Sequence, residues 1–171
     1  IFVVGISIIL IIHLLSYIIS HYYKKGDKSP LLIPHTKNGR HTVIISQDPE
    51  NINYLPIKRS ENEEGIEFAY SFWTIILDFD YKNGEWKHMF HKGNKTADPN
   101  KAPGVFIHPE TNSIHYFMNT LQNIDEYVDI EDIPIKKWVH MAIVLRGKYL
   151  DVYVNGYLRK RLELSSMAKQ N

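Results

Sequence analysis

The sequence predicts an all-β domain, a two-sheet antiparallel jelly-roll sandwich, preceded by one N-terminal helix. Three observations lead to this fold class. After residue 24 no segment has a sustained helical period. Short stretches rich in β-branched and aromatic residues follow one another, separated by Gly, Pro, Asn and Asp. Asn155-Gly156 stands between two stretches of alternating apolar and polar residues, which is a strong signal for a tight β-hairpin.

The N-terminal segment, residues 1–23, is predicted to be a transmembrane helix. Residues 1–19 contain no Asp, Glu, Lys or Arg, and about 20 apolar residues suffice to span the ~30 Å hydrocarbon core of a bilayer. The side chains predicted to lie in the membrane are Ile1, Ile8, Ile12, Leu15 and Ile19. Residues 21–40 hold five basic residues and one acidic residue, so the positive-inside rule predicts a single-pass protein whose β-domain lies on the cytosolic face.

The rest of the chain divides into three predicted segments. Residues 24–41 read as a juxtamembrane linker because Gly and Pro interrupt them and no period continues through them. Residues 42–164 hold the predicted β-sandwich, and residues 165–171 a C-terminal tail. The predicted strands, in order, are 42–46, 67–77, 86–92, 104–108, 113–119, 126–130, 138–145, 149–154 and 157–164.

The first five strands rest on composition and on turn signals. The segment 42–46, TVIIS, is short and β-branched. The segment 67–77, EFAYSFWTIIL, is apolar on both faces, which predicts a central strand. Asn83-Gly84 supplies the turn before the strand at 86–92. The next two strands form a hairpin around the Pro-Glu-Thr-Asn turn at residues 109–112.

The last four predicted strands have the clearest alternation and turn signals in the chain. The segment 126–130, EYVDI, alternates weakly, whereas 138–145, WVHMAIVL, is apolar on both faces. After a turn at Arg146-Gly147-Lys148, residues 149–154 alternate into the Asn155-Gly156 turn. In the returning strand, alternation predicts Leu158, Leu162 and Leu164 inward and Arg159, Arg161 and Glu163 outward.

Composition excludes some functions and favours one compartment. The chain has 171 residues, 20 basic and 19 acidic, with a formal net charge of +1, so charge gives no reason to expect a nucleic-acid partner. It contains no cysteine, which agrees with a reducing compartment.

The order of four motifs resembles the concanavalin A-like, laminin-G type jelly roll. The motifs are EFAYSFWTIIL, WKHMFHKGN, PGVFIHPETNSIHYF and WVHMAIVLRGKYLDVYVNG. Their hallmark is Trp138-x-His140-x-Ala142 leading through a glycine turn to the YVNG hairpin, and the resemblance covers residues 42–164. It implies a buried, hydrogen-bonded His140. More loosely, a hydrophobic N-terminus before such a domain resembles membrane-anchored lectin-like virion proteins of large nucleocytoplasmic DNA viruses.

The resemblance implies a non-enzymatic interaction module, a minor virion protein that links an inner membrane to capsid proteins of the shell. The alternative is a carbohydrate-binding lectin acting in attachment. The residues predicted to contact a glycan or partner are Tyr81, Trp86, Arg159 and Arg161. Asp78 and Asp80 are weak calcium candidates, because two carboxylates on one side of a strand suit a hard cation; no other cofactor is expected.

A glycoside hydrolase is the third and weakest reading. Glu126 and Asp129 are three residues apart and are expected on opposite faces of a strand, and Asp129 and Glu131 lack a third acid. His88 and His91 are likewise expected on opposite faces, so no metal site is predicted there. Asn94-Lys95-Thr96 is a glycosylation sequon that a cytosolic domain would leave unused.

Overall fold

The computed structural model describes residues 2–23, 29–60, 62 and 65–170. The chain forms two compact units, Ile1–Lys58 and Arg59–Asn171. The first unit begins with helix α1 (Phe2–Tyr23), which confirms the helix predicted for this segment. Among the residues described, no helix is both long and apolar enough to cross a membrane, so the structure gives the predicted span no support. In α1 the side chains of Ile12 and Leu15 are 57% and 52% exposed.

Part of the predicted anchor and linker lies outside the described residues, namely Ile1, residues 24–28 and the side chains of Ile8 and Ile19. Residues 29–58 form turns and one isolated bridge, between Ser46 and Tyr54. The strand predicted at 42–46 does not form. No strand covers this segment, and Ile44 is 60% exposed. The sandwich therefore begins in the second unit rather than at residue 42.

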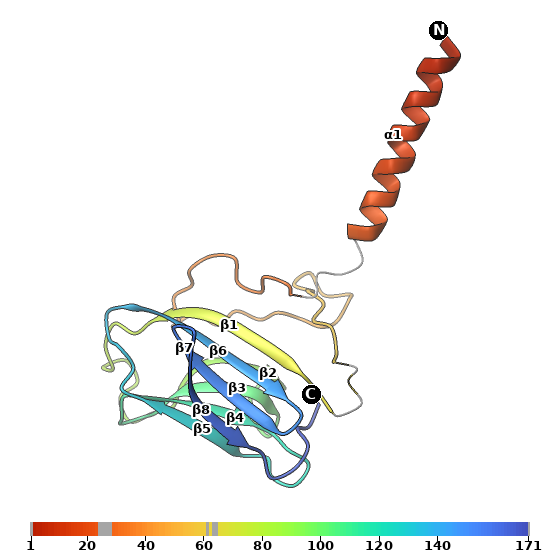
Figure 1. Ribbon diagram of the computed structural model, residues 1–171. Coiled ribbons are helices and arrows are strands. Elements are labelled where there is room, and N and C mark those ends of the chain that lie inside the picture. Colours follow the sequence, from red (N-terminus) through yellow and green to blue (C-terminus); the bar gives the residue numbers. More distant parts are fainter. Residues whose placement is uncertain (1, 24–28, 61, 63–64, 171) are drawn as a thin grey trace. The chain divides into compact units, whose positions relative to one another are not determined.

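The second unit is a sandwich of two four-stranded antiparallel sheets (Figure 1). One sheet has the order β1-β6-β7-β8 and the other β2-β3-β4-β5. The strands are β1 (Phe68–Ile75), β2 (Lys87–Gly93), β3 (Lys101–Ile107), β4 (Ser113–Met118), β5 (Glu126–Glu131), β6 (Trp138–Arg146), β7 (Tyr149–Val154) and β8 (Tyr157–Glu163). This architecture confirms the predicted two-sheet sandwich and is compatible with a jelly roll.

Strand alternation builds the core between the two sheets. In β6, every second side chain from Val139 to Leu145 points inward and is at most 1% exposed. The opposing sheet contributes Tyr116 of β4, whose hydroxyl donates to Sδ of Met141 in β6 at 3.1 Å. Fully burying an aliphatic side chain such as Val139 or Leu145 contributes about 1.5–3 kcal/mol to the stability of the fold. The layered core therefore holds the two outer faces on opposite sides of the unit.

β1 is an edge strand, not the central strand that its composition predicts. It pairs only with β6 in its sheet. Its inward residues, such as Phe72, pack on the core, but outward Trp73 is 64% exposed. The apolar character of both faces thus reflects an exposed apolar surface rather than a second buried one.

A β-bulge also reverses one facing prediction in β8. The register shifts between Val152 and Tyr153, so that Lys160 lies opposite Val152 and Leu158 lies opposite Tyr153. Leu158 is consequently 47% exposed instead of pointing inward. Leu164 follows the predicted inward alternation and is 2% exposed.

The predicted tail packs back on the sandwich as far as the structure describes it. The Ser165 N–H donates to the carboxylate of Glu126 at 2.9 Å, and the Ser165 hydroxyl bonds the same carboxylate. The Lys169 N–H donates to the carbonyl of Asn119 at 2.8 Å. Residues 165–169 therefore belong to the domain.

Candidate functional site

The outer face of the β2-β3-β4-β5 sheet carries a group of aromatic and imidazole rings. Strand register aligns one row of residues across all four strands: His88, Phe106, His115 and Asp129. The next row consists of His91, Gly104, Phe117 and Tyr127. The aromatic face is defined here by the rings of Trp86, Phe106, His108, His115, Phe117 and Tyr127.

Trp86 enters this face from the loop that precedes β2. Its ring meets three rings edge-on, with centroids 5.1 Å from His108, 5.0 Å from His115 and 5.8 Å from Phe117. Edge-to-face pairs of this kind contribute about 0.5–1.5 kcal/mol each beyond area burial. The indole is therefore held in place although 45% of the residue remains exposed.

A series of nearly parallel rings crosses the face from the end of β3 to β5. His108 stacks on His115 with centroids 5.2 Å apart and 28° between planes. His115 stacks on Tyr127 at 4.9 Å and 22°. Tyr127 is 50% exposed, so the series ends in a ring open to a ligand.

The two histidines of this series are fixed differently. His108 Nδ1 accepts the N–H groups of Glu110 at 3.2 Å and Thr111 at 3.1 Å, which ties the ring to the β3–β4 turn. His115 Nδ1 is buried and has no hydrogen-bond partner. Burial lowers the pKa of His115, and the neighbouring His108 lowers it further. The face therefore favours a neutral imidazole at its centre.

His88 and His91 lie in contact, contrary to the prediction from their spacing. His88 Nε2 is 2.7 Å from His91 Nδ1. The register of β2 shifts between His88 and Phe90, and this bulge brings two residues three apart to the same side. His91 Nε2 faces the Asn94 carbonyl at 2.8 Å, and since a carbonyl only accepts, Nε2 donates there. A neutral His91 then accepts a hydrogen bond from His88 at Nδ1.

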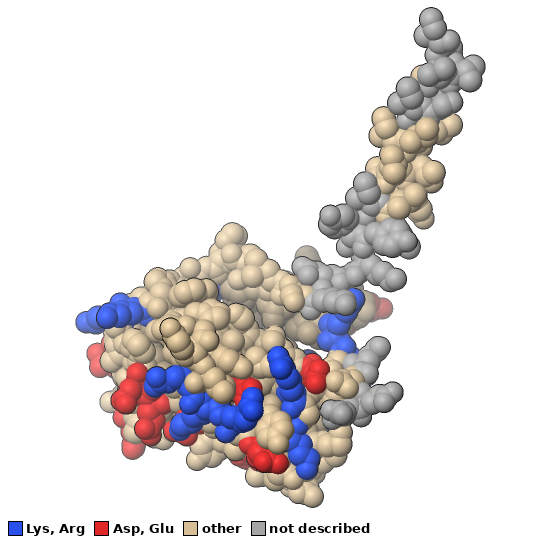
Figure 2. Space-filling model, viewed as in Figure 1, with Lys and Arg blue, Asp and Glu red and all other residues tan. Residues whose placement is uncertain are grey.

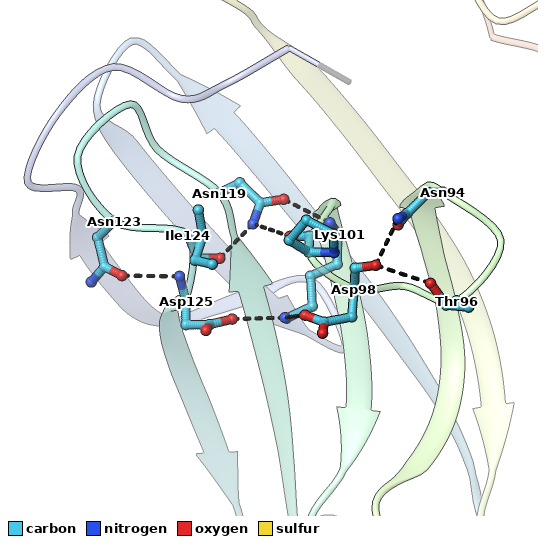
Figure 3. A network of polar contacts seen from close by, with 9 residues as sticks. Asn94, Thr96, Asp98, Lys101, Asn119, Asn123, Ile124 and Asp125 are labelled. Carbon is cyan, nitrogen blue, oxygen red and sulfur yellow. Dashed lines mark hydrogen bonds and ion pairs between the residues drawn. The ribbon is translucent and has the colours of Figure 1, made fainter.

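Lys101 lies at one border of the aromatic face, beside Phe117, and Figure 3 shows its ammonium between Asp98 and Asp125. Its Nζ lies 2.7 Å from Asp125 Oδ1 and 3.5 Å from Asp98 Oδ1. The same nitrogen lies 5.6 Å from the ring centroid of Phe117. Its side chain is only 12% exposed. The ammonium is therefore compensated by carboxylates and a ring face, and it places a fixed charge beside the rings.

Asn119 holds the loops at this border together (Figure 3). Its side-chain Oδ1 accepts the N–H of Lys101 at 2.6 Å. Its Nδ2 donates to the carbonyl of Pro99 at 3.0 Å and to that of Ile124. Asn119 is fully buried, so one side chain joins the segment before β3 to the loop between β4 and β5.

The carboxylates of β5 are held in their ionised forms. Lys160 Nζ donates to Asp129 Oδ1 at 3.1 Å, and this hydrogen bond lowers the pKa of Asp129. Burial acts to raise the pKa of Glu126, but hydrogen bonds from Ser165 and Thr120 outweigh it and the pKa is lowered. A glycosidase acid needs a raised pKa, and neither group fits that role.

The weak calcium candidates lie in a turn. Asp78 Oδ1 accepts the N–H of Asp80 at 3.2 Å, a turn-forming contact. Among the residues that the structure describes, no group of three or more His, Cys, Asp or Glu side chains could hold a metal ion.

Of the four residues predicted to contact a glycan or partner, Trp86 lies on the aromatic face. Tyr81 lies in the turn before it and is 39% exposed. Arg161 lies on the outer face of the other sheet, where its guanidinium bonds both oxygens of Asp151 at 2.6 and 2.7 Å. Arg159 lines a shallow pocket of about 370 Å³ between β5 and β8. The structure therefore does not bring these four together.

Sequence reasoning missed the remaining rings of the aromatic face. The signal was present in β4, where period-2 alternation puts Ile114, Tyr116 and Met118 inward and His115 and Phe117 outward. Cross-strand register was needed to show that Tyr127 of β5 meets these rings.

No protein-family model matches the chain, and no curated protein matches it in sequence. The fold and the geometry of the aromatic face therefore carry what can be said about function.

Proposed function

We propose that this chain is a non-enzymatic interaction module whose sandwich binds a structural partner protein at the aromatic face. The observation that carries the proposal is the exposure of fixed rings there: Trp86 is 45% and Tyr127 50% exposed although both pack on neighbouring rings. Rigid, half-exposed tryptophan and tyrosine side chains are typical anchors of protein interfaces.

The ionised carboxylates support a binding role over hydrolysis. Asp129 pairs with Lys160 and Asp125 with Lys101. These two carboxylates thus accept from lysines, and Glu126 accepts from Ser165 and Thr120, rather than standing ready to donate a proton. The ion pairs form a polar border around an apolar centre, which is the usual anatomy of an interface.

We further propose that residues 1–23 attach the module to a bilayer, with the sandwich on the cytosolic side. This part is supported by the sequence, through the uncharged residues 1–19 and the basic residues that follow. Combined with the virion-protein resemblance, it suggests a minor virion protein that links an inner membrane to capsid proteins.

The test is site-specific photo-cross-linking of the full chain in its native membranes or particles. A benzoyl-phenylalanine replaces Tyr127 on the aromatic face or, as a matched control, Tyr149 on the other sheet, which is 46% exposed. We expect one protein adduct from position 127 and none from position 149. Equal cross-linking from both positions, or none from either, would contradict the proposal.

Carbohydrate binding at the same face is the second candidate. Half-exposed Trp86 and Tyr127 beside charged groups could stack on a sugar ring while the border binds its hydroxyls. A glycan array with wild type and the Trp86→Ala variant, with and without calcium, separates the two. Glycan binding that is lost in the variant would favour the lectin reading.

Membrane orientation has its own test at Asn94. Its side-chain Nδ2 donates to the Asp98 carbonyl at 2.6 Å in an exposed loop, within the Asn94-Lys95-Thr96 sequon. Expression in cells that glycosylate should leave Asn94 unmodified. A mobility shift removed by a glycosidase and absent in Asn94→Gln would refute the cytosolic orientation.

A further inference from the structure

A second exposed apolar surface lies on the opposite side of the sandwich from the aromatic face. The outward row of β1 includes Trp73 and Ile75 and continues past the end of the strand to Leu77. Ile75 lies opposite Trp138 of β6. Trp73 is 64%, Leu77 61% and Trp138 50% exposed. Ile135, bridged to Ile76 beside the end of β1, is 41% exposed and lies next to this surface. The tryptophan edge is defined by Trp73, Leu77, Ile135 and Trp138.

Two lysines adjoin the tryptophan edge. Lys136 and Lys137 are both exposed and lie between Ile135 and Trp138. The N–H of Lys136 donates to the Ile76 carbonyl at 2.7 Å, which fixes this segment against the end of β1. Asp78 and Asp80, also exposed, follow Leu77, and exposed Asp132 precedes Ile135. The edge therefore combines exposed indoles and aliphatic side chains with two exposed lysines.

Charge on this sheet is concentrated away from the tryptophan edge. β1 contains no charged residue, and β6 contains one, Arg146, at its far end. Arg146 faces Tyr149 there, and the Asp151–Arg161 ion pair belongs to β7 and β8. Figure 2 shows the same contrast, with a mostly tan surface over β1 and β6 and charged side chains toward β8.

We propose that the tryptophan edge rests on the surface of an anionic bilayer. Indole rings prefer the headgroup region of a membrane, where the ring is buried and its N–H stays hydrated. Leu77 and Ile135 supply apolar area that reaches the acyl boundary. Lys136 and Lys137 meet anionic headgroups, which attract each basic residue near the surface.

The size of the edge favours a bilayer over a second copy of the chain. At about 3.3 Å per residue and 4.8 Å between strands, an edge four residues long and two strands wide covers on the order of 100–200 Å². A stable protein interface needs about 800 Å² per partner. A lipid surface requires neither that area nor shape complementarity.

This placement gives the two outer faces separate roles. One sheet would lie against lipid while the aromatic face of the other points away from the membrane toward a partner. The inference concerns a different surface from the proposed partner site, and it can hold or fail independently of that site.

The experiment uses the three tryptophans of the full chain, reconstituted in vesicles that carry brominated lipids as fluorescence quenchers. Trp86→Phe leaves Trp73 and Trp138 as reporters of the edge. Trp73→Phe/Trp138→Phe leaves Trp86, on the opposite face, as the matched control. In phosphatidylcholine vesicles containing phosphatidylserine, we expect strong quenching in the first variant and little in the second.

A charge test accompanies the quenching. Lys136→Ala/Lys137→Ala should shift the balance between docked and undocked domains by roughly 30-fold toward undocked, the value for two lysines on an anionic surface. Lys95→Ala/Lys148→Ala removes two exposed lysines elsewhere and should leave quenching unchanged. Loss of quenching in vesicles without phosphatidylserine is also expected.

Three results would overturn the inference. One is equal quenching of the edge tryptophans and Trp86. Another is no quenching of Trp73 and Trp138 while the chain co-floats with vesicles, which would leave the proposed tether intact. The third is a dimer cross-linked through the edge, which would assign the surface to a second copy. A chain that fails to float at all but is quenched on added anionic vesicles would refute the tether and support the edge.

Discussion

The buried amide of Asn119 should make a large contribution to the stability of the sandwich. Replacing Asn119 with Ala removes the acceptor of the Lys101 N–H and the donors to the carbonyls of Pro99 and Ile124. Asn119 is fully buried, so these three backbone groups lose partners that water cannot easily replace. At about 0.5–1.5 kcal/mol net for each of the three hydrogen bonds, the expected loss is about 1.5–4.5 kcal/mol. Domains of this size have a total stability of about 5–15 kcal/mol.

The assay is urea unfolding of the detergent-solubilised chain, followed by tryptophan fluorescence. A lower midpoint with an unchanged slope would report a loss of stability rather than a changed denatured state. Asn119→Asp keeps an acceptor for Lys101 but places an oxygen against two carbonyls, so it should cost at least as much. The matched control is Asn51→Ala, since Asn51 is exposed and its side chain accepts one N–H, from Asn53.

The control should change stability by at most about 0.5 kcal/mol, as expected for a surface site. If Asn119→Ala cost no more than Asn51→Ala, the amide would not join the two loops in the way described. Faster amide exchange in residues 94–101 of the Asn119→Ala chain would connect the loss of stability to the border of the aromatic face.

Three further predictions concern charge and backbone conformation. The Arg161 guanidinium donates to both oxygens of Asp151 and lowers the pKa of that carboxyl. The stabilisation by this ion pair is fully present above the unfolded pKa of Asp, about 3.9, and is lost as the pH falls through the lower pKa of the folded state. Acid unfolding should therefore converge for wild type and Asp151→Asn at low pH, and a constant difference down to pH 2 would argue against it. Asn155 has a φ of 51°, in the left-handed region, and its side chain accepts the His140 N–H at 3.0 Å. Asn155→Ala should therefore lower the free energy of unfolding in urea by about 1–2 kcal/mol, and by more than Asn155→Gly, because glycine adopts a positive φ without strain. Equal losses for the two variants would show that the positive φ is not the cause. Burial lowers the pKa of His115, so near and below the unfolded pKa of about 6.5 the unfolded chain binds more protons than the folded chain, and stability decreases as the pH is lowered. His115→Phe should therefore flatten the plot of unfolding free energy against pH between pH 7 and 5. An unchanged slope would show that another group causes the pH dependence.

Local chemistry in the sequence determined most of the strands. The segment at 138–145, the turn at Asn155-Gly156 and the hairpin at 104–119 all follow from side-chain alternation and turn residues, which act over a few neighbours. The segment at 42–46 has the composition of a strand but lacks a partner to pair with, and it stays irregular. Strand propensity needs a neighbouring strand before it produces a sheet.

Pairing between distant segments is what the tertiary structure alone decided. A strand that is apolar on both faces has the same composition whether its second face packs on a core or is exposed to solvent. The edge position of β1 and the exposure of Trp73 therefore could not be predicted from composition. A bulge in β2 places His88 and His91 on the same face although their spacing predicts opposite faces, because one extra residue moves every later side chain to the other face.

The aromatic face shows the same division. The sequence determined that His115 points outward from β4 and that Trp86 follows a turn. Only the register of β3, β4 and β5 decided that Trp86, His108 and Tyr127 converge on His115. Register is set by long-range packing of the inner faces, where the whole core selects one alignment, and no local signal along the chain encodes it.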